Sequence, residues 1–221
     1  MKNSIKFCLA TMLLFSISCS NEPITEAVND SQDFNNLTSR ATHQSSDVYD
    51  PISNYPNLDV VGTSTLVRNK NGITVNFMTT NLIPGHAYTL WWIIWNNPQY
   101  CAVPGECNDP DFGNAEAVGV DVLFAAGHVA DEDGVGTFSG HLRVDGAKGA
   151  FSSLGLEDGN AFSAEVHLVL RSHGPAIPGM VNEQISTVGG GCDVELGIFV
   201  AIPEEVGECG DIEFAIHSPV N

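Results

Sequence analysis

The feature that most restricts the fold is a series of short segments with a two-residue period, separated by turn residues. Residues 73–78 alternate apolar and mostly polar side chains, which is typical of a strand with one buried face. They follow Asn71-Gly72, a dipeptide that favours a tight hairpin turn. Residues 87–95 are apolar at nearly every position, as in a central strand covered on both faces. No segment of any length has a helical period.

About eight such segments predict an all-β fold, an antiparallel β-sandwich of the immunoglobulin-like or jelly-roll kind, over residues 51–221. We expect residues 118–129 and 135–144 to pair as a hairpin across Asp131-Gly134. The pattern leaves the strand order open. The predicted strands are residues 60–68, 73–78, 87–95, 118–129, 135–144, 162–171, 196–202 and 212–216.

The N-terminal residues have the pattern of an export signal. Residues 1–6 carry two lysines, and residues 7–17 form an apolar run that is too short to span a bilayer. Ser16-Ile17-Ser18-Cys19 resembles a bacterial lipobox, although Phe15-Ser16 stands where leucine is usual. The resemblance implies a bacterial lipoprotein that is cleaved after residues 1–18 and acylated on Cys19, with palmitate among the chains, and anchored at the outer membrane or cell surface.

Residues 19–50 are rich in Asn, Ser, Asp and Thr and have few apolar residues. This composition predicts a disordered tether between the lipid and the domain. The charge balance of the chain, 27 acidic against 8 basic residues, excludes nucleic acid as a partner, because few side chains are available to neutralise phosphates. Cations and basic partners are compatible with it.

Six cysteines divide by position. Cys8 belongs to the signal segment and Cys19 to the lipobox, which leaves an even number in an exported domain, where disulfides are the usual state. Three pairings are open, and we favour the two that close local loops, Cys101–Cys107 and Cys192–Cys209. A four-cysteine zinc site is the alternative, but the chain has no C-x2-C pair.

The stretch from Glu165 to Cys192 is the first candidate for a binding site. Glu165, His167 and Arg171 share one face of a predicted strand whose other face is apolar. The alternative is a solvent-facing surface with a Glu–Arg pair. The strand is expected to break at His173-Gly174-Pro175, and a loop then runs to Cys192. Long loops in compact domains are usually functional, so we predict that this loop forms the rim of the site, with His173 beside it.

A metal site is a second interpretation of the same strand. Glu165 and His167 lie about 7 Å apart on one face, and a third ligand would come across the sheet from His141, His217 or His128. His173 is about 20 Å along an extended strand from His167, so these two histidines are not expected to share an ion.

Carbohydrate binding is a third interpretation, because Trp91, Trp92 and Trp95 are able to stack on sugar rings. Their strand is apolar on both faces, which favours a place in the core. No nucleophile elbow follows the G-x-S-x-G pattern, and the glycines at 189–191 lack the Lys-Ser or Lys-Thr of a phosphate-binding loop. The sequence therefore shows no acyl-transfer machinery, and the alternative of an enzyme is one that uses a Zn or Cu ion at Glu165, His167 and a cross-strand histidine.

Three segments resemble a family of secreted bacterial proteins with no assigned activity: GHAYTLWWIIWNNP, AAGHVADEDGVGTFSGHL and AEVHLVLRSHGPAIPGMVNEQISTVGGGC. The likeness extends over most of residues 58–218 and implies no substrate or cofactor. Together the sequence predicts a lipid-anchored envelope protein with a binding or structural role, an envelope or extracellular ligand, and no required cofactor.

Overall fold

The computed structural model describes residues 41–220, and these residues carry nine β-strands, two short α-helices and two 3-10 turns. The strands are β1 (Thr42–Asp50), β2 (Asp59–Asn69), β3 (Gly72–Thr79), β4 (His86–Trp95), β5 (Val120–Val129), β6 (Gly136–Arg143), β7 (Glu165–Pro175), β8 (Val194–Ile198) and β9 (Glu208–His217). The helical turns are η2 (Pro98–Tyr100), η3 (Asp109–Asn114), α1 (Ala115–Val118) and α2 (Val181–Gln184).

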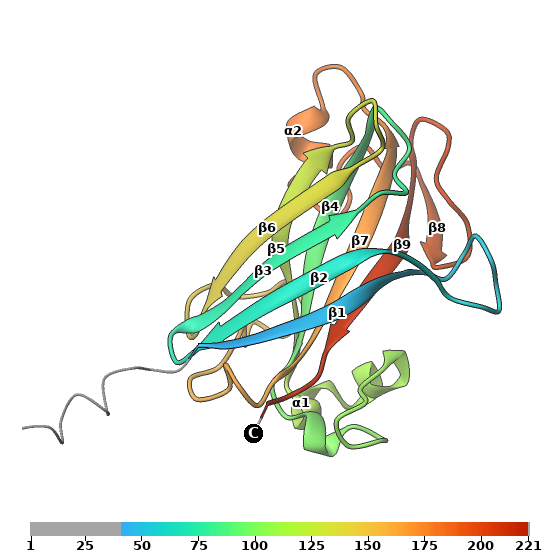
Figure 1. Cartoon of the computed structure of the whole chain (residues 1–221). Coiled ribbons are helices and arrows are strands. Elements are labelled where there is room, and N and C mark those ends of the chain that lie inside the picture. Colours follow the sequence, from blue (N-terminus) through green and yellow to red (C-terminus); the bar gives the residue numbers. More distant parts are fainter. Residues whose placement is uncertain (1–40, 221) are drawn as a thin grey trace, which may run out of the picture. The chain divides into compact units, whose positions relative to one another are not determined.

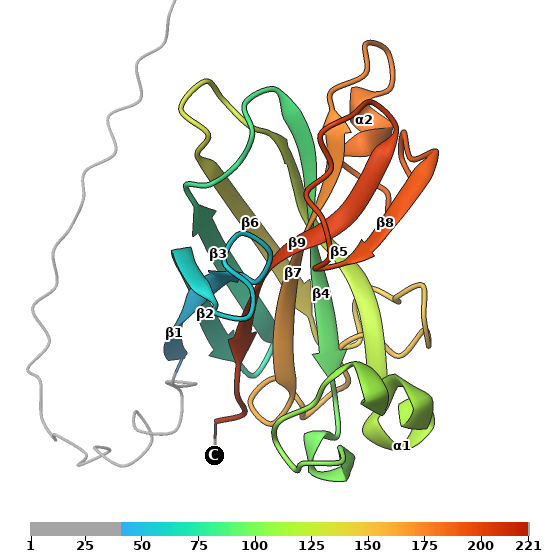
Figure 2. The ribbon, with the colours of Figure 1, turned by 90° about the vertical axis from the view of Figure 1, so that its right-hand side faces the viewer.

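The strands form one sheet in the order β5-β4-β7-β9-β1-β2-β3-β6, with β8 beside β9. All neighbours are antiparallel except β8 and β9. The end strands β5 and β6 also meet, since a Cβ on Gly140 would lie 2.9 Å from the carbonyl oxygen of Ala125. The sheet is therefore nearly closed (Figures 1 and 2). The predicted all-β antiparallel fold is confirmed, and its architecture is barrel-like rather than clearly a sandwich.

The turn at Asn69–Gly72 joins β2 and β3 as a hairpin, as the Asn-Gly signal predicts. The hairpin expected between residues 118–129 and 135–144 is wrong. Here β5 pairs with β4, and β6 pairs with β3, so the Asp131–Gly134 turn links opposite ends of the sheet order. Contact between β5 and β6 is by side chains at the seam, where the rings of His128 and Phe138 pack edge-on with centroids 5.9 Å apart.

The first strand corrects the predicted domain boundary. Residues 42–50, assigned from composition to the tether, form β1 and pair with β2 along their whole length. On the other side β1 pairs with β9 only at Tyr49 and Phe214. Strand β1 is half-exposed and unpaired along most of one edge, and such strands tolerate polar residues. This explains why its composition is unusually polar for a strand. The predicted signal segment, Cys19 and most of the tether lie outside the described residues.

The two apolar faces of β4 pack into two clusters, as its sequence suggests. Leu90, Trp92 and Ile94 point into the barrel and join the main core, while Trp95 points outward. The outer cluster is built with Trp95 from the segment that follows β4, which folds back over the sheet. Its other buried members are Cys101, Cys107, Val118 and Val120.

The gap between β1 and β9 is filled by the side chain of Arg68, which is fully buried. Its guanidinium donates hydrogen bonds to four backbone carbonyls, those of Ala161, Ala164, His217 and Ser218, and to the side chain of Gln44. Burial lowers the pKa of Arg68 to about 10, so the group stays charged at neutral pH. The arginine therefore joins three separate segments at the seam.

Asp121 and Glu213 are two of the buried carboxylates of the fold, and their hydrogen-bond partners differ. Asp121 accepts hydrogen bonds from five backbone N–H groups, those of Val122, Gly149, Phe151, Ser152 and Gly155. Glu213 lies on the inner side of β9, where its Oε2 has no partner among the described residues. Asp50 and Tyr88 line the same small cavity, of about 30 Å³.

Candidate functional site

The polar strand predicted from residues 165–171 divides into two separate environments on β7. Glu165 and His167 lie together, with Oε1 and Nε2 2.6 Å apart. Arg171 lies further along, where its guanidinium pairs with Asp211 at 3.0 Å and with Glu195. The Glu–Arg pair considered from sequence does not form, because each partner is engaged elsewhere. The prediction that Glu165, His167 and Arg171 share one face of the strand is correct. That face holds two separate polar clusters.

The Glu165–His167 pair is anchored by the disulfide loop after β4. The backbone N–H of Cys107 donates to Glu165 Oε1 at 2.9 Å, and the Cys101–Cys107 disulfide closes the loop that presents it. Glu165 is buried, and its second oxygen, Oε2, has no partner among the residues that the structure describes. The side chain of His167 is 12% exposed. The carboxylate therefore holds the imidazole in one orientation at the edge of solvent.

The proton position in the His167 ring follows from this contact. A carboxylate only accepts hydrogen bonds, so Nε2 is the protonated nitrogen. In the neutral ring Nδ1 is then an acceptor, and the hydrogen bonds of the described part of the chain leave it unpaired. His167 thus offers one oriented polar atom to a ligand.

His167 lines an apolar groove of about 370 Å³ on the outer face of the sheet, while the buried Glu165 is not part of its lining. Its floor comes from neighbouring positions on three adjacent strands: Ile93 of β4 pairs with His167, and His167 with Ile216 of β9. The next row includes Val169 and Phe214. The walls are the loop residues Cys107, Asn108, Asp109 and Pro110 on one side and Phe199 on the other. Concave, mostly apolar sites with few polar groups are typical of small-ligand binding.

A second hollow adjoins the groove at Phe199. It has a volume of about 390 Å³ and is lined by Pro51, Ile52, Tyr55 and Val200 as well. Tyr55 and Val200 are strongly exposed apolar side chains. The outer face of β4, β7 and β9 therefore continues into a longer apolar surface.

The long loop after β7 is less open than predicted. Strand β7 continues to Pro175 instead of breaking at His173, and α2 follows within the loop. Gln184 of α2 is buried and donates to the carbonyls of His173 and Pro175. The predicted rim does border a hollow of about 470 Å³, lined by Ile177, Met180, Glu183, Thr187 and residues 189–193. This hollow lacks an oriented polar pair.

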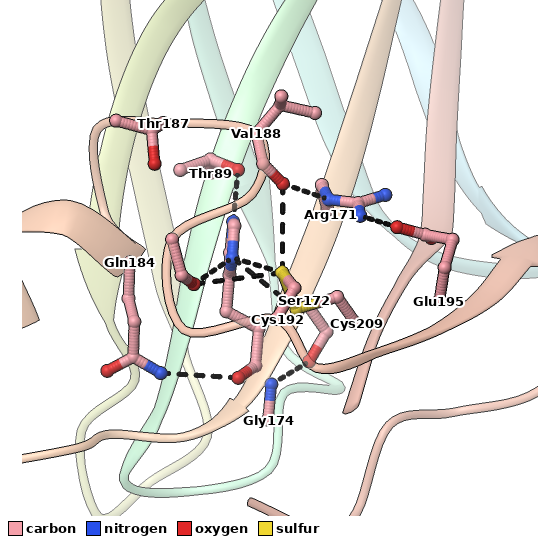
Figure 3. Close-up of a disulfide and its surroundings, with 12 residues drawn as sticks. Thr89, Arg171, Ser172, Gly174, Gln184, Thr187, Val188, Cys192, Glu195 and Cys209 are labelled. Carbon is pink, nitrogen blue, oxygen red and sulfur yellow. Dashed lines mark hydrogen bonds and ion pairs between the residues drawn. A yellow bond between two sulfur atoms is a disulfide. The ribbon is translucent and has the colours of Figure 1, made fainter. Parts of the chain in front are cut away.

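His173 is buried and bonds to this loop, next to the Cys192–Cys209 disulfide. Figure 3 shows the surroundings of that disulfide. His173 Nδ1 bonds to the carbonyl of Gly190 at 2.9 Å, and its Nε2 to Thr89 Oγ1 at 2.9 Å. Burial lowers its pKa to about 4, so the ring is neutral at pH 7. His173 with Cys192 and Cys209 is the one cluster of three potential metal ligands in residues 41–220. The two sulfurs are joined to each other in a disulfide and are not available as thiolates.

The five residues considered for a metal site are not brought together as a set of ligands. His128 of β5 packs its ring against Phe138 of β6. His141 of β6 bonds to Thr74 Oγ1 at 2.8 Å, and His217 of β9 bonds to Ser64 Oγ at 2.8 Å on the inner side. Burial, with the nearby charges of Arg68 and His167, lowers the pKa of His217 to about 4. Only Glu165 and His167 are adjacent. A metal ion at this pair would need ligands from solvent or substrate.

Both predicted disulfides are present, Cys101–Cys107 and Cys192–Cys209, and the segments that they close lie at opposite ends of the sheet (Figures 1 and 2). Trp92 and Trp95 are buried, which favours the core interpretation of the tryptophans. Trp91 is half-buried and packs edge-on against Phe124 with centroids 5.8 Å apart. The groove itself was missed from sequence, because its floor depends on the adjacency of β4, β7 and β9.

Comparison with protein-family models, with curated proteins and with solved structures gives no match to this chain. In residues 41–220, no helix is long and apolar enough to cross a membrane. The function must therefore be argued from the groove and from the sequence signals themselves.

Proposed function

We propose that this chain is a lipid-anchored protein of the bacterial cell envelope that binds a small, largely apolar ligand in the groove that His167 lines. The single observation that supports the proposal is the groove, in which apolar side chains from three strands surround His167, a histidine oriented by the buried Glu165. Ligand sites commonly have this composition and a volume of this order.

Three features support binding rather than catalysis. The groove contains no serine or cysteine thiol beside His167 that could act as a nucleophile, since Cys107 is in a disulfide. The pair is held by the backbone of a cross-linked loop, which favours a preformed site. Its apolar lining is partly exposed, with Ile216 at 39%, and exposed apolar patches on secreted domains commonly mark binding surfaces.

Binding is tested with Nile red, a neutral dye that becomes fluorescent in apolar sites. We expect wild-type protein to bind the dye saturably, and Ile216→Asp, which places a charge on the groove floor, to weaken binding at least tenfold, because a charge in an apolar site is poorly solvated. The matched control is Val60→Asp, an exposed valine of β2 that does not line the groove. Equal loss in both variants, or none in Ile216→Asp, would contradict the proposal.

The anchor is tested separately, in a bacterial host that processes lipoproteins. The wild-type protein should partition into the detergent phase of Triton X-114, and mass spectrometry of its N-terminal peptide should show acyl chains on Cys19. Cys19→Ser should move the protein to the aqueous phase, since stable anchoring needs more than one acyl chain. Aqueous partitioning of the wild type would refute the lipoprotein assignment without affecting the groove.

A further inference from the structure

We infer that the ligand of the groove carries a protonated amine at its polar end. This inference rests on the proposed binding function and adds the chemical class of the ligand. It starts from the hydrogen-bonding character of the groups that line the site. In the neutral ring His167 Nδ1 is an acceptor, because Nε2–H is given to Glu165. The carboxylate of Asp109, exposed on the groove wall, accepts only.

The one amide among the lining side chains does not reverse this balance. The Nδ2 group of Asn108 is directed to the carbonyl of Glu106 at 3.4 Å. A ligand whose polar end donates hydrogen bonds therefore finds acceptors on both sides of the groove, while a ligand that only accepts finds, among the lining side chains, the single N–H of Asn108 that its bond to Glu106 leaves over.

No lysine or arginine of residues 41–220 lines the groove. The described residues include five Lys and Arg side chains: Arg68, Lys70, Arg143, Lys148 and Arg171. Arg171, on the same strand, is buried and already bonded to Asp211, Glu195 and the carbonyl of Val188. A carboxylate or phosphate on the ligand would therefore lack a counter-charge, whereas an ammonium group meets Asp109.

The charge of the whole chain acts in the same direction, with 27 acidic against 8 basic residues. Such a field attracts any cation, so the test must separate it from the local effect. Long-range attraction between exposed charges is largely screened at about 0.5 M salt, where the Debye length is only a few ångströms. A preference for the amine that persists at this salt concentration therefore comes from groups at the groove and not from the overall charge of the chain.

Three probes with the same tail and different ends make the test: octylamine, 1-octanol and octanoate, each titrated against bound Nile red at pH 7 in 0.15 M and 0.5 M NaCl. We expect octylamine to displace the dye at a concentration about tenfold lower than octanoate in 0.5 M NaCl, with 1-octanol between them. Equal displacement by all three, or preference for octanoate, would overturn the inference and leave the groove intact as an apolar site.

Asp109→Asn is the diagnostic variant, since the residue is exposed and its substitution removes one charge without changing the shape of the wall. The substitution should weaken the binding of octylamine about threefold to fivefold, the range of an exposed charge pair, and leave the binding of 1-octanol unchanged. The control is Glu132→Gln, which removes one charge from the exposed β5–β6 turn. An equal effect of both variants would assign the preference to the overall charge and refute the local site.

The two levels of the proposal fail differently. Absence of saturable Nile red binding, or binding that Ile216→Asp does not change, would refute the groove as a binding site and with it the inference. Dye binding that depends on Ile216 but shows no preference among the three ends would refute only the amine.

Discussion

Asp121 and Glu213 are both buried acids, yet their surroundings differ completely. For Asp121, burial acts to raise the pKa, but the hydrogen bonds from Ser152, Gly155, Val122 and Gly149 lower it on balance. For Glu213, burial raises the pKa to about 8, and the nearby charge of Asp50 adds to the effect. The difference shows that burial alone does not fix the charge of a carboxyl group; the donors around it do.

Glu165 of the candidate site lies between these extremes. One of its oxygens accepts two hydrogen bonds, from Cys107 N–H and His167 Nε2–H, and the other has no partner among the described residues. Asp121 holds the 149–155 loop through hydrogen bonds, and Glu213 places a carboxyl group with an unpartnered oxygen inside the barrel. Glu165 orients His167, which lines the groove. The following predictions test the three carboxylates and the disulfide beside Glu165, from the largest expected effect to the smallest.

Asp121→Ala should destabilise the protein most, by roughly 3–5 kcal/mol, because it leaves backbone N–H groups of the 149–155 loop without an acceptor. The measurement is urea denaturation followed by tryptophan fluorescence. Asp158→Ala, at an exposed position in the next loop, is the control and should change stability by less than about 0.5 kcal/mol. A small effect at Asp121 would show that its hydrogen bonds are replaceable by water.

Glu213 should make stability fall as the pH rises. Its pKa is about 8 in the folded protein against 4.5 in its ordinary state, so the folded form holds an extra proton between these values. The stabilising contribution is complete below about pH 4.5 and is lost as the pH rises through 8. Glu213→Gln should remove this dependence and exceed the wild type by about 2 kcal/mol or more at pH 9.

The comparison of wild type and Glu213→Gln is made by urea denaturation at pH 4.5, 6, 7.5 and 9. Other titrating groups are common to both proteins, so the difference between the two curves reports on Glu213. Parallel curves over the whole range would mean that the carboxyl group is solvated in the folded protein. The pH dependence that Asp121 contributes has the opposite direction. Its lowered pKa stabilises the folded protein at neutral pH, and this stabilisation is lost below about pH 4.

Replacing both Cys101 and Cys107 by serine should destabilise the protein by about 2 kcal/mol, as expected for a disulfide that closes a short loop. It should also weaken Nile red binding, since this loop supplies both the Cys107 N–H and one groove wall. Binding is measured well below the unfolding midpoint, so that the folded fraction stays complete. Unchanged affinity would show that the wall holds its position without the cross-link.

Glu165→Gln should have the smallest effect on stability, about 1 kcal/mol. The amide oxygen still accepts from Cys107 N–H, but the new NH2 group lies where no acceptor is described. In the binding assay the variant should retain Nile red and lose part of its preference for octylamine, because the negative charge behind His167 is removed while the amide oxygen still accepts from Cys107 N–H and His167 Nε2–H. If the variant kept its full preference for octylamine, the Glu165–His167 pair would have no part in selecting the ligand.

Much of the fold could be predicted because it follows from local pattern. The alternation in residues 73–78 gives β3, and the apolar run at 87–95 gives β4. Spacing along the chain also favoured the correct disulfides. By contrast β1 was missed, because its edge position allows polar residues that composition alone assigns to a tether. The β5–β6 hairpin was wrong because a short turn does not determine which strands pair across a closed sheet.

The candidate site was only partly predictable, for a related reason. The period of a strand places Glu165 and His167 on one face, and the structure brings them into contact. Their other neighbours come from distant parts of the sequence: Cys107 is 58 residues from Glu165, and the groove floor needs β4 and β9 on either side of β7. Such adjacency depends on strand order, which periodicity does not contain.

The place of β9 in the sheet has a consequence for how the chain acquires its structure. It lies between β7 and β1, so in the described sheet the backbone pairing between the two halves runs through residues 208–217, while β5 and β6 touch at the other side. Arg68 likewise finds its acceptors at residues 161, 164, 217 and 218. Closure therefore waits until these late residues have been synthesised, and contacts of such long range form slowly.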